Sequence, residues 1–295
     1  MQVVVSCYKS MKYLILGNGA AGATAADKLR TLDIKARITL ISSDDSIAYA
    51  KIMLPDYIGG KIVREKLFLR SDMENKIGLL KSRRAIKINT DKRYVELDNN
   101  RKEHYDKLLI ATGSVSFIPN ISGLDTVDYY TVSSLKDADI IKNNVKKDQI
   151  AIILGGGLTG IEMSFALARL GVKPYLVEKN EYILSSQLNE PGTETMKAWL
   201  NKDNIVVFTN TSLVKINSEK EAFFSDGQVI KFDLLVCAVG TRPNISLVKE
   251  SNINVNRGII VNESMHTSVD GVFAAGDVCE FDNGGVSGYV SAYIW

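Results

Sequence analysis

The sequence predicts an α/β fold that contains the same three-layer domain twice, with the second copy inserted into the first. A chain of 295 residues is long enough for two domains of ordinary size. A short apolar run, a glycine turn and a helical segment also follow one another at two places, which indicates an internal repeat of a βαβ unit. The 45% of hydrophobic and 24% of charged residues are typical of a globular protein.

The first copy begins with residues 12–17 (KYLILG), a short apolar run that predicts a buried parallel strand. The glycine turn at 17–22 (GNGAAG), an Ala-rich helix and a second apolar strand at 37–41 follow it. Alternating apolar residues over 85–98 predict a hairpin. Residues 105–113 predict a further strand, which ends in a glycine turn.

The second copy repeats this order. Residues 149–154 predict a strand, 155–160 (GGGLTG) a glycine turn, 162–170 a helix and 174–178 a second strand. The strand at 232–240 then matches the one at 105–113. Matched positions with identical residues are Asp106 and Asp233, Leu108 and Leu235, Ala111 and Ala238, and Gly113 and Gly240.

Each glycine turn has the form GxGxxG between a strand and a helix. The first glycine allows the tight turn, the second lets a diphosphate approach the backbone, and the third lets the helix pack closely on the strand. The helix N-terminus adds free N–H groups and a partial positive charge. A single turn of this form is also compatible with a tight turn that binds no ligand, but two at matched points of a repeat predict two dinucleotide sites.

An acidic residue about 20 positions after the first glycine is expected to bind a ribose hydroxyl. In the second copy Glu178 ends the second strand. Its negative charge would repel the 2′-phosphate of NADPH and therefore favours NADH, although the positive charge of the neighbouring Lys179 opposes this effect. In the first copy Ser42 stands at this place, so we expect Asp44 to contact the ribose. A solvated turn is the alternative for Asp44.

Charge and cysteine usage exclude several classes of function. The 36 basic and 34 acidic residues nearly balance, which gives no support for nucleic-acid binding. Cys7, Cys237 and Cys279 lie far apart in the sequence, so no CxxC pair, disulfide framework or cysteine-based metal site is expected. Residues 1–10 do not resemble a signal peptide, and the apolar stretch 149–168 contains four glycines, so we expect no membrane span and a cytoplasmic location.

Several motifs together resemble the FAD-dependent pyridine-nucleotide oxidoreductases, which contain two dinucleotide-binding domains. They are GNGAAG, LLIATG at 108–113, GGGLTG followed by Glu162, AVGTRPN at 238–244 and TSVDGVFAAGD at 267–277. The resemblance implies two Rossmann-like domains. It assigns residues 11–116 and 244–295 to a discontinuous FAD-binding domain and 117–243 to an inserted NAD-binding domain.

Residues 41–54 are similar to the NADH:rubredoxin reductase branch, in which an acidic pair precedes a Tyr-x-Lys-x-x-Leu motif, here Tyr49 to Leu54. The flavin subunits of nitrite reductases have a comparable motif with arginine. NADH oxidases and CoA-disulfide reductases resemble this segment but have a redox cysteine near the position of Ile52, which is absent here. Disulfide chemistry is therefore not expected.

The resemblance implies an enzyme in which NADH reduces FAD and the electrons pass to an external acceptor, such as rubredoxin or another small carrier. Lys51 would lie near the flavin and stabilise negative charge, and Glu162 would lie at the nicotinamide junction and pair with Lys51. The alternative for Lys51 is an ordinary surface lysine. The alternative for Glu162 is a charge in the first turn of the helix that compensates the helix dipole. Related flavoproteins have a lysine where this chain has Asp56.

The resemblance also assigns cofactor-binding residues. Those expected at FAD are Gly17, Gly19, Ala20, Ala21, Gly22, Asp44, Lys51, Ala85, Ala111, Thr112, Gly113, Gly276 and Asp277, with the Asp277 carboxylate on the ribityl chain. Those expected at NAD(P)H are Gly155, Gly157, Leu158, Thr159, Gly160, Glu178 and Gly240. Cys237 and Cys279 are expected to be inert, and no metal site is expected.

The sequence ends at Trp295, soon after Asp277, whereas members of the family continue with a helix and an interface domain. The interface domain is therefore expected to be absent, and the chain to be truncated or completed by a second polypeptide. Two other functions stay open at this point: the flavin subunit of a larger, nitrite-reductase-like complex, and a truncated FAD-binding protein without catalytic activity.

Overall fold

The computed structural model describes residues 10–69 and 77–281 of the chain. These residues form two compact units. Of the described residues, unit 1 contains 10–50, 68–69, 77–114 and 242–281, and unit 2 contains Lys51–Leu67 and Val115–Thr241. The segment Lys51–Leu67 therefore belongs to unit 2, whereas the sequence placed it in the same domain as the first glycine turn. The chain passes between the units along β8 (Ser114–Ser116) and β16 (Thr241–Pro243), which pair with each other.

Unit 1 is built on a parallel five-stranded sheet with the order β18-β7-β1-β2-β3. The strands are β1 (Lys12–Leu16), β2 (Arg37–Ile41), β3 (Gly78–Leu80), β7 (Lys107–Ile110) and β18 (Val272–Ala274). Helix α1 (Ala20–Leu32) connects β1 to β2. Because the chain leaves β1 toward β2 and later adds β7 on the other side, the carboxyl ends of β1 and β7 form a topological switch point.

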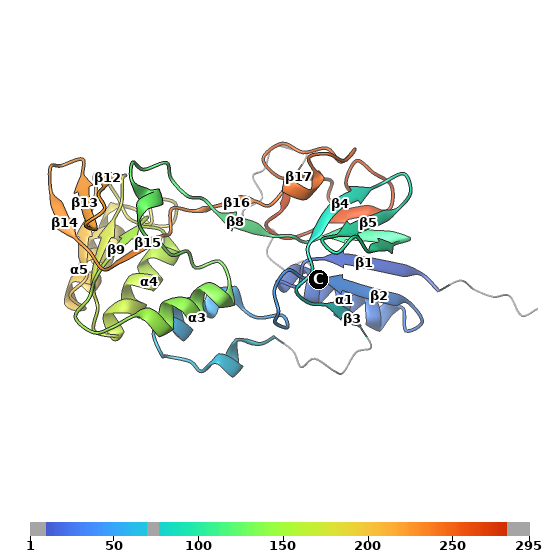
Figure 1. Ribbon diagram of the computed structural model, residues 1–295, viewed down its shortest axis with the longest axis horizontal. Helices are drawn as coiled ribbons and strands as arrows, with labels where there is room; N and C mark the ends of the chain where they lie inside the picture. Colours follow the sequence, from blue (N-terminus) through green and yellow to red (C-terminus); the bar gives the residue numbers. More distant parts are fainter. Residues whose placement is uncertain (1–9, 70–76, 282–295) are drawn as a thin grey trace, which may run out of the picture. The chain divides into compact units, whose positions relative to one another are not determined.

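The alternation of apolar residues along β1 produces the three layers of unit 1. Ile15 packs with Ala26 of α1 on one face of the sheet. Leu14 and Leu16 point to the opposite face and pack with Val95 of a small antiparallel sheet. That sheet consists of β4 (Ala85–Asn89), β5 (Tyr94–Leu97) and β6 (Lys102–His104). Figure 1 shows α1 below β1 and β4 and β5 above it.

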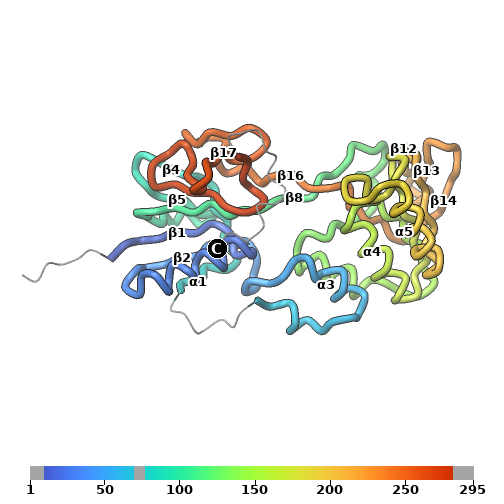
Figure 2. The backbone as a smooth tube through the Cα atoms, turned by 180° about the vertical axis from the view of Figure 1, so that it is seen from behind, coloured from blue at the N-terminus to red at the C-terminus, as the bar shows by residue number. Residues whose placement is uncertain are grey.

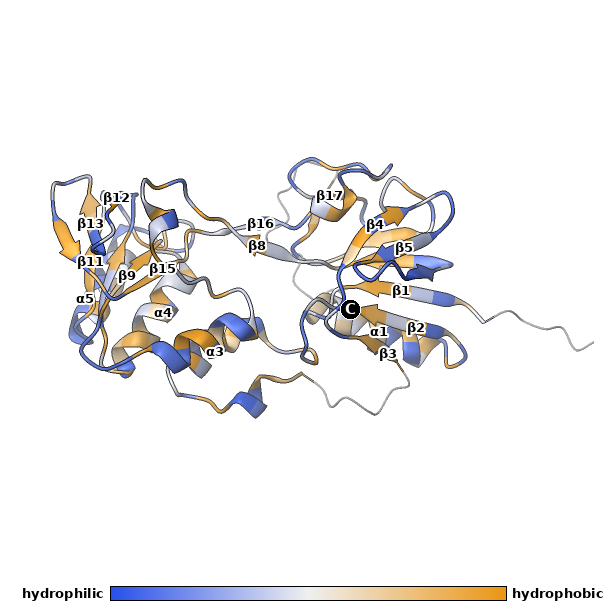
Figure 3. Ribbon diagram, viewed as in Figure 1, coloured by the Kyte–Doolittle hydropathy of each residue, from blue (hydrophilic) through white to orange (hydrophobic). Residues whose placement is uncertain are grey.

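Unit 2 repeats this arrangement, with the sheet order β11-β10-β9-β15. The strands are β9 (Ile150–Leu154), β10 (Lys173–Val177), β11 (Val206–Phe208) and β15 (Leu234–Cys237). Helix α4 (Leu158–Arg169) connects β9 to β10, as α1 connects β1 to β2. Figure 3 shows β9 and β15 coloured as hydrophobic, and their residues are almost completely buried.

A second antiparallel sheet covers one face of unit 2. It consists of β12 (Leu213–Ile216), β13 (Glu221–Phe224) and β14 (Val229–Lys231), and it corresponds to β4-β5-β6 of unit 1. Phe224 of this sheet packs with Ile152 and Leu154 of β9. The predicted fold of two Rossmann-like units is confirmed, and the repeat extends to the small sheets, of which the sequence had indicated only the hairpin of β4 and β5.

The other elements connect or cover these sheets. They are the helices α2 (Leu54–Ile58), α3 (Leu135–Asn144) and α5 (Glu190–Lys202), the short 3-10 turns η1 (Lys51–Met53), η2 (Arg64–Leu67), η3 (Leu124–Thr126) and η4 (Ser246–Val248), and the paired strands β17 (Ile259–Val261) and β19 (Cys279–Phe281). Figure 2 shows the same elements from behind, and the blue segment that contains α2 runs beside α3. Within the residues described, no helix is both long and apolar enough to cross a membrane.

Candidate functional site

The first and third glycines of each turn are required by the protein itself. Gly17 has a φ of +112°, and a Cβ atom there would lie 2.1 Å from the carbonyl oxygen of Ala111. A Cβ on Gly22 would lie 2.0 Å from the oxygen of Gly17. These distances are far below van der Waals contact, so no other residue fits without a shift of the backbone.

The second turn has the same geometry. Gly155 has a φ of +104°, and its Cβ would lie 2.4 Å from the oxygen of Ala238, while a Cβ on Gly160 would lie 1.9 Å from the oxygen of Gly155. The N–H of Gly155 donates to Val177 at 2.8 Å, as that of Gly17 donates to Ile41 at 2.8 Å. The two corners are therefore the same structure formed twice.

The middle glycines, Gly19 and Gly157, are not required by any contact within the protein. A Cβ on either would meet no described atom within 4 Å, and both have φ angles near −80° that other residues adopt. Each is the N-cap of its helix and makes no side-chain capping bond, and neither α1 nor α4 has an acidic residue in its first turn. A glycine in open space before free N–H groups is suited to a diphosphate that must approach the backbone closely.

The two other long helices, α3 and α5, have N-termini that are capped by side chains of the protein. Helix α3 begins with a capping box between Ser134 and Asp137, and α5 begins with an Asn189 side chain that accepts from the N–H of Gly192. Their first N–H groups are satisfied by the protein. Among the described helices of ten or more residues, only the two that follow the glycine turns begin without a side-chain cap. In these first turns lie the predicted residues Ala20, Ala21, Leu158 and Thr159.

Glu178 is held beside the second corner. Its side chain accepts from the N–H of Gly156 at 2.7 Å and from the N–H of Asn180 at 2.8 Å, and only 8% of the residue is exposed. Two charge-assisted hydrogen bonds fix the carboxylate where β10 ends. The sequence had indicated Glu178 but not these backbone donors, which depend on the closed turn.

The corresponding place in unit 1 differs. Ser42 is buried at the end of β2, and its hydroxyl accepts from the N–H of Asp44 at 3.2 Å. The Asp44 carboxylate accepts from the Tyr49 hydroxyl at 2.9 Å. This loop is connected to the first corner by a hydrogen bond of 3.5 Å from Asn18 Nδ2 to the carbonyl of Ser46. Asp44 is thus a half-buried side chain held by Tyr49 in the loop after β2, and its contact with a ribose stays a prediction.

Two further segments of unit 1 meet the first corner. Gly276 follows β18, and a Cβ there would lie 3.1 Å from the Cβ of Ala21 at the start of α1. Asp277 is exposed and accepts from the hydroxyl of Ser114 at 3.0 Å. The Thr112 hydroxyl donates to the carbonyl of Asn244 at 3.0 Å. The carboxyl edge of this sheet thus brings an exposed carboxylate near a helix N-terminus, and sequence reasoning did not anticipate Ser114.

The remaining predicted FAD and NAD residues lie at the edges of these sheets. Ala111 is buried after β7 and forms the wall that Gly17 faces. The carbonyl of Gly113 accepts from Asn244 at 2.9 Å, and that of Gly240 accepts from Phe117 at 2.9 Å. Ala85 opens β4 and packs against the core of unit 1.

Lys51 and Glu162 both lie in unit 2 and are exposed. Among the residues that the structure describes, no ion pair joins them, so the expected pair is absent. Helix α4 begins at Leu158 rather than at 162, which places Glu162 in the second turn and excludes a first-turn role. Although Glu162 is exposed, neighbouring protein atoms partly desolvate its carboxyl group, which raises its pKa, and the nearby carboxylate of Asp56 raises this pKa further.

The described cysteines are buried and unreactive. Burial raises the pKa of Cys237 to about 11, and burial together with the charge of Asp277 raises that of Cys279 to about 12. Neither forms a thiolate at neutral pH, and the thiolate is the reactive form. Cys7 lies outside the described residues.

A family model described as pyridine nucleotide-disulphide oxidoreductase matches residues 11–293, which is nearly the whole chain. The chain belongs to this family. Within the family, the NADH-rubredoxin oxidoreductase of Clostridium acetobutylicum is 32% identical over 276 residues, which cover 92% of this chain and 69% of that protein. Its crystal structure matches with a TM-score of 0.81 and 30% identity over 95% of this chain and 71% of that chain.

The nitrite reductase (NADH) large subunit of Escherichia coli is another relative, 28% identical over 284 residues. The match covers 92% of this chain but 34% of that protein, so the chain spans about a third of its length. Both branches that residues 41–54 resembled are therefore found among the relatives, and the resemblance inferred from the motifs is confirmed.

Proposed function

We propose that unit 1 binds FAD, that unit 2 binds NADH, and that electrons pass from NADH through the flavin to an external carrier. The observation that supports this most strongly is the pair of uncapped helices behind Gly19 and Gly157. In each unit the protein's own packing explains the first and last glycines of the GxGxxG motif, and the middle glycine is left for a ligand to explain. The rubredoxin oxidoreductase relative agrees with this function.

In this proposal the chain's own residues bind and orient the cofactors. The N–H groups of α1 would hold the FAD diphosphate, with Asp277 accepting from hydroxyls of the ribityl chain. The N–H groups of α4 would hold the NADH diphosphate, with Glu178 accepting from ribose hydroxyls. FAD held by these residues would supply a group able to take up a hydride from NADH and to release the electrons singly or in pairs.

Two side chains of unit 2 are proposed to act on the reaction. Lys51 carries an exposed ammonium group that would stabilise negative charge. Glu162 would hold a proton at a higher pH than an ordinary carboxyl group, because burial and Asp56 raise its pKa.

We propose that the acceptor is a one-electron carrier such as rubredoxin. The buried positions of Cys237 and Cys279 leave no described thiol that could take electrons from the flavin. A second candidate function is that of a flavin unit in a larger assembly, in which a second polypeptide takes part. The relationship to the nitrite reductase large subunit favours it.

Anaerobic reduction tests the proposal. The purified protein, saturated with FAD, should lose its flavin absorbance within seconds of NADH addition and much more slowly with NADPH. Because the carboxylate of Glu178 would repel a 2′-phosphate, E178Q should narrow the preference for NADH at least tenfold. E219Q removes an exposed carboxylate elsewhere in unit 2 and should keep the wild-type preference for NADH over NADPH.

Two equivalents of oxidised rubredoxin per flavin, added to wild-type protein reduced with one equivalent of NADH, should take one electron each and restore the flavin absorbance. Flavin that stays oxidised in the presence of NADH would contradict the proposed activity. Reduction by NADH without reoxidation by rubredoxin would contradict the proposed acceptor and favour the second candidate function.

A further inference from the structure

Helix α2, which follows Lys51, is too short to be stable alone. It has only five residues, and isolated helices shorter than about 12 residues are marginal in water. Leu54 and Ile58 of α2 are fully buried, and the helix contacts α3 and α4 of unit 2. A Cβ on Gly59 would lie 2.9 Å from the Cα of Ala166 in α4. Tertiary contacts with unit 2 therefore hold this segment.

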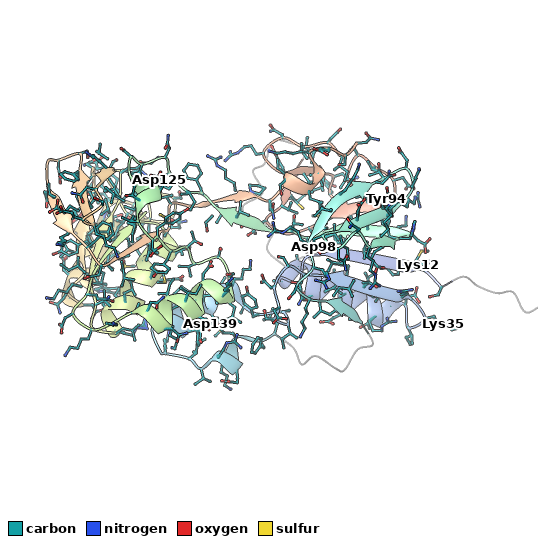
Figure 4. All side chains as sticks on the ribbon, in the orientation of Figure 1. Lys12, Lys35, Tyr94, Asp98, Asp125 and Asp139 are labelled. Atoms are coloured by element: carbon teal, nitrogen blue, oxygen red, sulfur yellow. The ribbon has the colours of Figure 1, made fainter. Side chains whose placement is uncertain are left out.

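A single carboxylate on α3 connects to two points of this segment. Asp139 accepts from the Tyr57 hydroxyl at 2.7 Å through Oδ1 and pairs with Arg64 at 3.2 Å through Oδ2. From the same helix, Lys142 donates to the carbonyl of Tyr57 at 2.6 Å, and its ammonium lies 4.5 Å from the centre of the Tyr57 ring. Figure 4 shows Asp139 on α3.

The segment held in this way contains the charged groups next to Glu162. Asp56 on α2 interacts electrostatically with Glu162 on α4. The carboxylate of Asp56 lies 3.3 Å from the ammonium nitrogen of Lys61 and 3.9 Å from a guanidinium nitrogen of Arg169, another residue of α4. Lys51 precedes α2 directly, in the turn η1. The position of α2 therefore determines where Lys51 and Asp56 lie with respect to Glu162 on α4.

We propose that Asp139 is a positioning residue for the reaction. By holding Tyr57 and Arg64, it fixes the Lys51–Leu67 segment within unit 2, so that Lys51 keeps its place relative to Glu162 of the same unit. This inference rests on the proposed function, because it assumes that Lys51 and Glu162 take part in flavin reduction. It explains why a segment that lies within the first repeat of the sequence belongs to the second unit of the structure.

Asp139→Asn tests this role, because asparagine keeps the shape but loses the charge that pairs with Arg64. Tyr57→Phe is the second variant, and it removes only the hydroxyl that donates to Asp139. Glu194→Gln is the matched control, because it removes another carboxylate of unit 2 that pairs with a lysine, Lys197 at 2.9 Å. All are compared as FAD-loaded chains of residues 1–295.

Hydrogen exchange is the first measurement. The amides of Gly59, Gly60 and Lys61 donate to carbonyls of residues 55–57 and report on the end of α2. We expect them to exchange about tenfold faster in D139N and Y57F than in E194Q, with no change in β1 of unit 1. Stopped-flow reduction is the second measurement. The limiting rate with NADH should fall about tenfold, while the Kd for NADH and the FAD content stay unchanged.

Exchange and limiting rates in D139N and Y57F equal to those of E194Q would overturn the inference. Faster exchange with an unchanged limiting rate would overturn it as well, because the contact would then be structural only. If NADH does not reduce the wild-type flavin at all, the proposed function fails, and the inference falls with it. That outcome differs from a failure of the inference alone, in which the wild-type protein is reduced normally.

Discussion

Single glycines in this protein meet two different requirements. Gly22 and Gly160 are needed because a side chain would collide with the backbone of the same turn. Gly19 and Gly157 meet no such obstacle, so their requirement is expected to come from a bound molecule. The sequence shows all of them as the same residue type, and only the distances separate a folding role from a binding role.

Gly160→Ala is therefore predicted to destabilise the fold, and Gly157→Ala is not. The new methyl group in G160A would lie 1.9 Å from the oxygen of Gly155, which must move, and we expect a loss of about 2–4 kcal/mol in the free energy of unfolding. In G157A the methyl group enters open space, and a loss of less than about 1 kcal/mol is expected. Urea unfolding without cofactors measures both, and equal losses would contradict this division.

At the scale of elements, the strands and the helices α1 and α4 follow from local patterns, whereas the attachment of short elements does not. The apolar run of β9 and the glycine turn after it are visible in the sequence. The packing of α2 on α3 and α4 depends on the contacts of Asp139 and Ala166, which are distant in sequence from α2. No local pattern could reveal such a contact, so the sequence alone did not indicate that this segment packs in unit 2.

The strand pair β17 and β19 supplies a prediction about pH. Glu280 on β19 is 8% exposed, and it accepts from the N–H of Gly258 at 2.8 Å and from Asn256 at 2.8 Å. The Gly258 bond is the main cause that lowers the pKa of Glu280 in the folded state. Its contribution to stability is therefore present above the ordinary carboxyl pKa and is lost as the pH falls through the lower, folded value.

We expect E280Q to unfold more easily than the wild-type protein by about 1–3 kcal/mol at pH 7. The difference should begin to shrink below about pH 4.5, where the carboxyl group of the unfolded chain takes up a proton, and should be lost as the pH falls through the lower pKa of the folded state. Urea unfolding of both proteins across this range measures it. A difference that stays constant or grows toward low pH would refute the assigned role of the carboxylate.

At the scale of the whole molecule, the repeat determines what could be predicted. Two matched glycine turns indicated two Rossmann-like units and the places where ligands would bind, because the physics of the turn is local. The partners of Glu178 and Asp277 could not be predicted, because Gly156, Asn180 and Ser114 reach them only when the sheets are formed. The predicted pair of Lys51 and Glu162 is absent for a related reason, since ion pairs between exposed side chains are weakly determined.

Each glycine corner is proposed to bind a different dinucleotide, and a count of the cofactors bound by two matched variants tests this proposal. Equilibrium binding to the wild-type protein should give one FAD and one NADH per chain. G19A should weaken FAD binding at least tenfold and leave NADH binding unchanged, and G157A should do the reverse, since each methyl group would occupy the space of one diphosphate. Unchanged affinities in both variants, or the loss of both cofactors in either one while the protein stays folded, would contradict the claim.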